Sequence, residues 1–238
     1  MSKFANLFRI AYHGGDFHGS QIQPDVVTVE GVVKNILKNL GASSPLFASR
    51  TDKGVNATCN IITTTSNKKC KEYVGDFIER LDEYPIWITG FSDVEIDFNP
   101  RIAIEREYRY YVFNEKNKVL FNEAMQLFVG KHDFKNFARI LDTDIVDTRR
   151  TVKRIDVISK GEVIMCEIKG LSFLGNSKSK RNDLSIFFIL KTLPTVSTWP
   201  WQICPEIFVP YFKGNSKFIL SLIFKNLNFE RIIVSLDR

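Results

Sequence analysis

The sequence contains few of the residues that bind metals or form covalent cross-links. It has four cysteines and three histidines among 238 residues, and no two cysteines form a C-x-x-C pair. A chain of this length can bury a core large enough to fold without disulfides, so we expect free thiols in a reducing compartment. His13, His18 and His132 are too scattered along the chain for a zinc site, so we expect no metal.

Long apolar runs are also missing. No segment approaches the roughly 20 apolar residues that a membrane-spanning helix needs, and residues 1–15 do not contain the apolar stretch of a signal peptide. We therefore expect a cytoplasmic protein without membrane association. Three glycines lie within residues 13–19, but no Gly-Lys-Ser/Thr pattern follows them, so we expect no nucleotide cofactor.

Positive charge is in excess but unevenly distributed. The net charge of +6 and the pI of about 9.1 fit a polyanionic partner such as nucleic acid. Residues 171–238 contain nine Lys/Arg and four Asp/Glu, a net of +5, which leaves +1 for the first 170 residues. Charge alone therefore gives the first 170 residues no strongly basic character.

Hydrophobic periodicity predicts an α+β fold with a mostly antiparallel sheet. Residues 28–41 have apolar residues at helical spacing, with Thr28 as N-cap and Gly41 after the helix. The other predicted elements are helices over 71–83 and 132–142, strands over 6–13, 45–49, 56–65, 86–94 and 105–114, and a hairpin over 151–170. We divide the chain into two α+β halves, residues 1–96 and 97–238, and assign no firm structure after residue 175.

Two short motifs have a structural and a functional interpretation each. Arg50 and Asp52 lie next to Lys53-Gly54 between two predicted strands, which by itself favours a charged surface turn over a catalytic carboxylate. Tyr108 and Tyr110 alternate along a strand, which by itself favours packing over stacking on a nucleobase. Neither motif decides the function alone.

The ordered combination of motifs resembles the TruA family of tRNA pseudouridine synthases. The motifs are Y-H-G-G-D-F-H-G-S-Q-I-Q, S-R-T-D-K-G-V-N-A, R-E-Y-R-Y, D-F and G-L-S-F-L, within residues 7–174. The resemblance implies two similar ferredoxin-like α+β halves that form a mostly antiparallel central sheet around a cleft. It also implies a homodimer that acts on the anticodon stem-loop of tRNA, without cofactor or metal.

The resemblance also implies the roles of three residues. Asp52 would be the catalytic nucleophile, attacking either the uracil base or the ribose C1′ of the target uridine. Arg50 would hold the Asp52 carboxylate, because an adjacent cation favours its ionised form. Tyr108 would stack on the uracil, which must leave the helix stack before a side chain can reach it.

The sequence departs from the family pattern at several positions. His13 and Ser20 replace a frequent Asp and a frequent aromatic residue, and Asn56 replaces a usual His or Ser. After Leu174 the family continues into an apolar helix with a V-R pair, whereas this chain reads G-N-S-K-S-K-R-N-D. Either the segment from residue 175 is divergent or the reading frame has shifted. The alternative function is therefore a catalytically impaired tRNA-binding or RNA-folding protein with the synthase fold.

Overall fold

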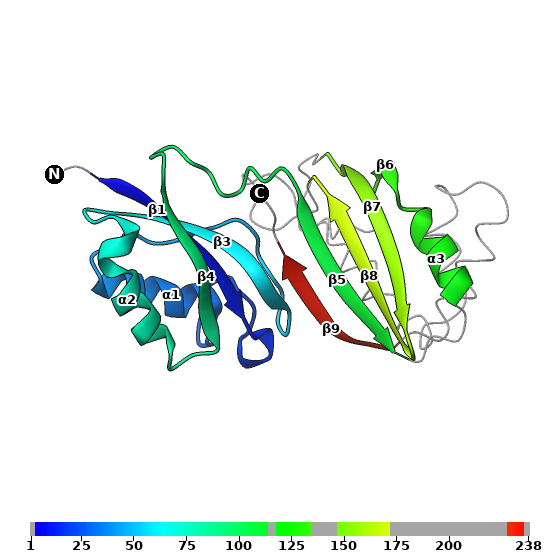
Figure 1. Ribbon diagram of the computed structural model, residues 1–238, viewed down its shortest axis with the longest axis horizontal. Coiled ribbons are helices and arrows are strands. Elements are labelled where there is room, and N and C mark those ends of the chain that lie inside the picture. The colour runs from blue at the N-terminus through cyan, green and yellow to red at the C-terminus, as the bar shows by residue number, and fades with distance from the viewer. Residues whose placement is uncertain (1–2, 114–117, 135–146, 172–227, 236–238) are drawn as a thin grey trace. The chain divides into compact units, whose positions relative to one another are not determined.

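The computed structural model describes residues 3–113, 118–134, 147–171 and 228–235. The chain forms two compact units (Figure 1). Unit 1 comprises Met1–Ile104 with Arg231–Arg238, and unit 2 comprises Glu105–Glu230. The predicted boundary between residues 96 and 97 lies in the connection that precedes unit 2.

Unit 1 has the β-α-β-β-α-β order of a ferredoxin-like fold. Its elements are β1 (Phe4–Tyr12), η1 (Gly14–Asp16), α1 (Val29–Asn39), β2 (Leu46–Phe47), β3 (Asn56–Ser66), α2 (Cys70–Leu81) and β4 (Ile86–Val94). The antiparallel strands have the order β4-β1-β3, with the short β2 also on β3. The last residues of β9 (Asn228–Ser235) pair with β3 in parallel.

The core of unit 1 lies between its sheet and its two helices, which contact one another (Figure 1). Phe8 of β1 has no exposed surface and meets the rings of Tyr73 and Phe77 on α2 edge-on, with ring centroids 5.9 and 5.1 Å away. The face of α1 that is buried carries Val29, Val32, Val33, Ile36 and Leu37. They are the apolar residues of the predicted helical stripe except Leu40, which is the C-cap and is partly buried.

The ends of α1 form as the sequence predicts. The Oγ1 of Thr28 accepts a hydrogen bond from the N–H of Gly31, at 3.2 Å, and so caps a helix terminus that has no intrahelical partner for its N–H groups. Gly41 follows the last turn with a φ of 79°, a left-handed conformation that glycine adopts without a Cβ clash. The predicted helix over 71–83 is also confirmed, as α2.

Unit 2 is built on an antiparallel sheet in the order β5-β8-β7-β6. Its elements are β5 (Arg106–Phe113), α3 (Lys118–Gln126), β6 (Gly130–Asp133), β7 (Arg149–Lys160) and β8 (Val163–Gly170). The neighbours β5, β8 and β7 repeat the arrangement of β1, β3 and β2 in unit 1. The predicted α+β class with a mostly antiparallel sheet is thus confirmed, as is the hairpin, which turns at Gly161 with a φ of 62°.

Two predictions differ from the structure of unit 2. Helix α3 was not predicted, although Phe121, Ala124 and Met125 are buried at helical spacing. The predicted helix over 132–142 is wrong at its start, because His132 and Asp133 belong to β6 and pair with Arg150 and Arg149 of β7. The rest of that prediction from residue 135, and nearly all of the chain after residue 171, lie outside the described residues.

Cys59, Cys70 and Cys166 are buried free thiols, while the fourth cysteine lies outside the described residues. Within the described ranges no helix has the length and hydropathy that crossing a membrane requires. The same ranges contain no cluster of three or more His, Cys, Asp or Glu side chains arranged to hold a metal ion.

Candidate active site

The loop between β2 and β3 carries Arg50 and Asp52, and both side chains are exposed on either side of the buried Thr51. The loop closes as a β-turn, because the N–H of Val55 donates to the carbonyl of Asp52 at 3.2 Å. Gly54 occupies this turn with a φ of 82°, a conformation that side chains disfavour. The structure therefore brings two of the predicted site residues onto one tight loop in unit 1.

Every polar group of Thr51 is engaged by residues of the first motif. Its N–H donates to the Oγ of Ser20 at 2.7 Å, and its carbonyl accepts from the N–H of Ser20 at 2.9 Å. Its Oγ1 lies 2.8 Å from the hydroxyl of Tyr12. The residue that separates Arg50 from Asp52 is therefore fixed in both backbone and side chain.

Two asparagines hold the surroundings of Thr51 in place. The Nδ2 of Asn60 donates to the Tyr12 hydroxyl at 3.2 Å and to the carbonyl of Ser49 at 3.0 Å. The Oδ1 of Asn56, at a position where the family usually has His or Ser, accepts from the N–H of Gly14 at 2.8 Å. Both asparagines belong to β3, so this strand positions the start and the end of the loop.

The glycines of the first motif lie directly against the Asp52 loop. A Cβ on Gly14 would lie 2.0 Å from the carbonyl oxygen of Val55, and a Cβ on Gly19, whose φ is 89°, would lie 2.9 Å from that of Thr51. The Nε2 of Gln23 donates to the carbonyl of His18 at 2.8 Å and closes the glycine-rich loop on itself. The glycines therefore allow close backbone packing, a use of glycine that differs from cradling a phosphate.

Tyr108 lies on β5 in unit 2 and is half-buried. Strand alternation places it on the same face as Arg106, whose Nη1 donates to the carbonyl of Leu171 at 3.0 Å. Burial lowers the pKa of the Arg106 guanidinium, against a smaller opposing effect of Tyr108. Tyr108 belongs to unit 2 and Asp52 to unit 1, so an approach of Tyr108 to Asp52 stays a prediction.

Comparison with known proteins finds similarity to tRNA pseudouridine synthases. A family model described as tRNA pseudouridine synthase matches residues 124–177. A tRNA pseudouridine synthase A of Thermococcus sibiricus is 41% identical over 174 residues, which are 70% of this chain and 64% of that protein. The enzyme of the same name from Pyrococcus abyssi is 42% identical over 175 residues, 70% of this chain and 63% of that protein. The chain is thus similar to the TruA family over about 70% of its length.

The TruA match does not extend over the whole length of these relatives. A relative from Methanosarcina barkeri is 35% identical over 180 residues, 72% of this chain and 66% of that protein. The chain thus spans less than two thirds of the length of the curated relatives it matches. Among solved structures, one chain of a Cbf5–Nop10–Gar1 complex aligns with 95% of this chain. The alignment covers 48% of the length of that chain, with 11% sequence identity and a TM-score of 0.38. That score is too low to establish a common fold.

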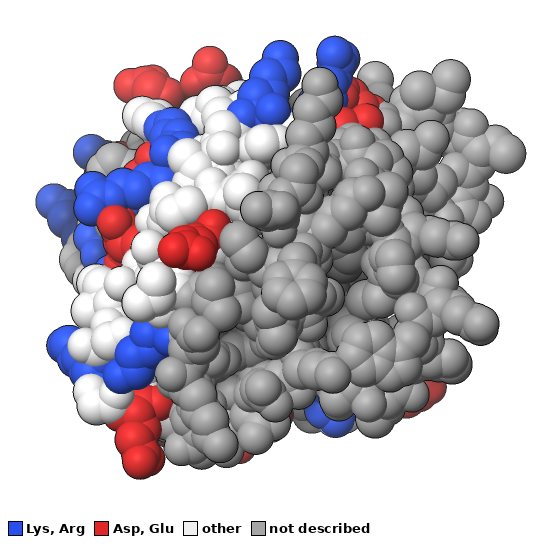
Figure 2. Space-filling model, turned by 90° about the vertical axis from the view of Figure 1, so that its right-hand side faces the viewer, with Lys and Arg blue, Asp and Glu red and all other residues white. Residues whose placement is uncertain are grey.

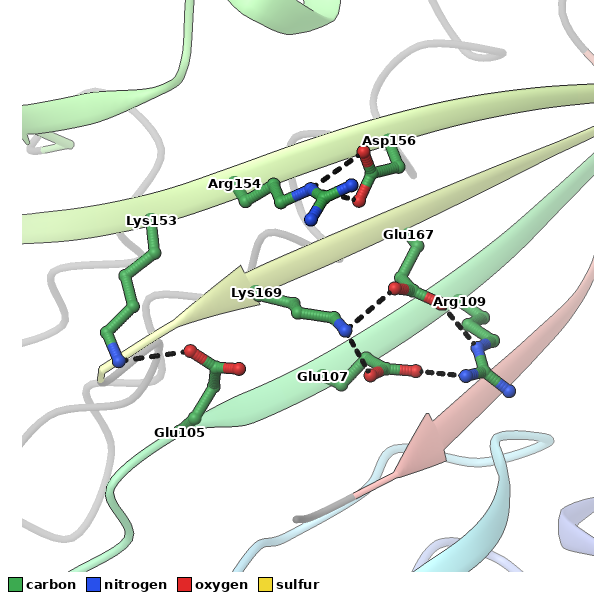
Figure 3. A network of polar contacts seen from close by, with 8 residues as sticks. All are labelled: Glu105, Glu107, Arg109, Lys153, Arg154, Asp156, Glu167 and Lys169. Atoms are coloured by element: carbon green, nitrogen blue, oxygen red, sulfur yellow. Dashed lines mark hydrogen bonds and ion pairs between the residues drawn. The ribbon is translucent and has the colours of Figure 1, made fainter.

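The opposite face of β5 carries a closed network of charges (Figure 3). The Nζ of Lys169 lies 3.0 Å from a carboxylate oxygen of Glu107 and 3.0 Å from one of Glu167. The Nε of Arg109 donates to Glu167 at 2.9 Å, and its Nη2 lies 2.5 Å from Glu107 without the alignment of a hydrogen bond. These four residues form the charge ring of unit 2.

The charge ring changes the protonation of its members. Burial raises the pKa of Glu167, but hydrogen bonds from Lys169 and Arg109 lower it by more, so the net pKa lies below its usual value. The same bonds to Glu167 and Glu107 raise the pKa of Lys169. Sequence reasoning missed the ring, although the alternation of Glu105, Glu107 and Arg109 marks a polar face.

Charges of both signs are mixed on the described surface as well. Figure 2 shows Lys and Arg side chains interspersed with Asp and Glu among the described residues of that face. The pairs Lys153–Glu105 and Arg154–Asp156 extend the pattern beside the ring, at 3.0 and 2.7 Å. This distribution agrees with the near-neutral balance of the first 170 residues.

Proposed function

We propose that this chain is a tRNA pseudouridine synthase in which Asp52 is the nucleophile. The observation that carries the proposal is the loop: Asp52 is exposed, while the preceding Thr51 is held by Ser20 and Tyr12 through three short hydrogen bonds. Such a loop presents a carboxylate in a fixed position, which covalent catalysis requires. The curated relatives named for this activity support the proposal.

The proposed reaction is an isomerisation. The Asp52 carboxylate attacks the base or the ribose C1′, the bond from C1′ to N1 of uracil breaks, and the base turns. A bond then forms from C1′ to C5 and the bond to Asp52 breaks, which returns the free carboxylate. C5 loses its proton and N1 gains one, so no oxidant or other co-reactant is required. Arg50 keeps the carboxylate ionised, and Tyr108 stacks on the flipped uracil.

The finer assignments belong to the same proposal. The substrate is a uridine in the anticodon stem-loop of tRNA, and the protein acts in the cytoplasm as a homodimer. Light scattering on the purified full chain measures the dimer directly, and a mass of twice 27.4 kDa is expected. A monomer that still forms pseudouridine would contradict the dimer and leave the reaction standing.

An exchange of one carboxylate for an amide tests the nucleophile. Asp52→Asn in the purified full chain should lower pseudouridine formation at least about 1,000-fold, measured on tRNA transcripts by carbodiimide adduct stops. Binding of tRNA should stay within about threefold, since phosphate contacts dominate affinity. Asp76→Asn is the matched control, because Asp76 is exposed on α2 and the charge change is the same. A rate of pseudouridine formation by Asp52→Asn within about tenfold of the wild-type rate would refute the assignment.

A second function is favoured by one observation. The match to the family model ends at residue 177, and residues 178–238 lie beyond its end. A chain whose last part departs from the family suits a tRNA-binding or RNA-folding protein without turnover. In that case the wild-type protein binds tRNA, forms no pseudouridine at any position, and loses nothing measurable on Asp52→Asn substitution.

A further inference from the structure

Ser20 connects the start of helix α1 to the Asp52 loop. Its side chain is buried, with 1% of the residue exposed. Its carbonyl accepts from the N–H of Glu30 at 2.8 Å, and the carbonyl of Gly19 accepts from the N–H of Val29 at 3.3 Å. These N–H groups have no partner within the helix. The first turn of α1 therefore fixes the position of Ser20.

From this position Ser20 holds the two peptide groups on either side of the Thr51 Cα. Its Oγ accepts from the N–H of Thr51 at 2.7 Å, which belongs to the peptide bond that follows Arg50. Its own N–H donates at 2.9 Å to the carbonyl of Thr51, which belongs to the peptide bond that precedes Asp52. The orientation of the Asp52 backbone thus depends on Ser20.

The hydroxyl of Ser20 is one of the departures of this chain from the family pattern, in which an aromatic residue is frequent at that position. The ring of a Phe or a Trp offers no acceptor for a backbone N–H. Without the hydroxyl, the Thr51 N–H loses its hydrogen bond in a buried position, and one of the two peptide groups is released.

We propose that Ser20 is a positioning residue for Asp52, and that its hydroxyl holds the Asp52 carboxylate at the place where the target uridine reacts. The proposal rests on the function proposed above. Ser20 does not touch the substrate in this scheme. It acts through Thr51, so its loss affects the chemical step and leaves tRNA binding in place.

Ser20→Ala in the full chain tests the proposal, with Ser66→Ala as matched control. Ser66 is also a buried serine of unit 1, 6% exposed, whose Oγ donates to Asn6 at 3.0 Å and accepts from the N–H of Lys68 at 3.1 Å. It lies at the far end of β3 from the Asp52 loop. Both variants remove one buried hydroxyl, but only one of them touches Thr51.

Single-turnover conversion of a tRNA transcript, with protein in excess, separates chemistry from binding. For Ser20→Ala we expect the maximal rate constant to fall about 10- to 100-fold and the half-saturating protein concentration to stay within about twofold. For Ser66→Ala we expect neither value to move more than about twofold. A maximal rate constant of Ser20→Ala equal to that of Ser66→Ala overturns the proposal.

Hydrogen exchange at the Thr51 amide keeps the proposal separate from the proposed function. We expect Ser20→Ala to speed exchange at this amide about tenfold or more, while Ser66→Ala leaves it unchanged. If the wild-type chain forms no pseudouridine, the proposed function fails, and the exchange rate alone then decides whether Ser20 holds the loop. Equal exchange at Thr51 in the wild type and in Ser20→Ala overturns the positioning role.

Discussion

Replacing Glu167 with glutamine tests whether the charge ring stabilises unit 2. The Glu167 carboxylate accepts from Arg109 at 2.9 Å and from Lys169 at 3.0 Å, and its side chain is 13% exposed. Glutamine keeps the size of the side chain and removes its charge. Both cations therefore lose one carboxylate and keep only Glu107 as partner in the ring.

The expected loss follows from burial. Breaking a fully buried ion pair costs about 3–5 kcal/mol, whereas an exposed pair contributes about 0–1 kcal/mol. Arg109 and Lys169 keep 37% and 27% of their side chains exposed, so water and Glu107 offset part of the loss. We expect Glu167→Gln to lower the free energy of unfolding of unit 2 by about 1–2 kcal/mol.

The loss should depend on pH in a defined direction. The pKa of Glu167 in the folded chain lies below the ordinary glutamate value of 4.5. The ionised carboxylate therefore contributes its full stability above pH 4.5, and the contribution disappears as the pH falls through the lowered folded pKa. The difference between wild type and Glu167→Gln should shrink below pH 4.5.

Hydrogen exchange of the β5 and β8 amides in increasing urea measures unit 2 separately from unit 1. Glu105→Gln is the control, because Glu105 pairs with one half-exposed cation, Lys153, outside the ring. We expect this control to cost at most about 1 kcal/mol. Equal losses for the two variants, or a difference that persists unchanged at low pH, would refute the reasoning.

Two further predictions concern the Asp52 loop. Tyr12→Phe should lower the free energy of unfolding of unit 1 by about 1–3 kcal/mol, because Thr51 Oγ1 and one bond of Asn60 lose their buried partner. The double variant Tyr12→Phe/Thr51→Val should lose less free energy of unfolding, measured in urea, than the two single variants lose together. A loss equal to the sum of the two single losses would contradict this prediction. Gly14→Ala should slow tRNA modification, since its Cβ would lie 2.0 Å from the Val55 carbonyl oxygen. Gly75→Ala on α2 is its control: it meets no atom within 4 Å and should raise stability by about 0.5–1 kcal/mol.

Local patterns in the sequence predict most of unit 1. Helix α1 follows from its apolar stripe, from Thr28 and from Gly41, all of which act over a few residues. Helix α3 shows the same kind of signal in Phe121, Ala124 and Met125, so periodicity could have found it. The wrong helix start at His132 has another cause, because pairing with β7 decides the structure of β6 and no local pattern contains that pairing.

The candidate site was only partly accessible to sequence reasoning. The R-T-D-K-G-V motif marks Arg50 and Asp52 as loop residues, and Gly54 marks the turn. The contacts of Thr51 with Ser20 join residues 31 positions apart, so they depend on the packing of two loops. The charge ring likewise depends on strand register, which places Glu107 opposite Lys169 and Arg109 opposite Glu167.

The bonds between Ser20 and Thr51 have a consequence for exchanging parts between homologues. A chimera that takes only residues 49–57 from a homologue would combine the turn of the homologue with Ser20 of this chain. A chimera that takes only residues 12–23 would place a side chain of the homologue against the Thr51 amide. Because the two segments share hydrogen bonds at Tyr12, Ser20 and Asn56, they form one interchangeable part of the protein. Any transplant of substrate preference would have to move both segments together.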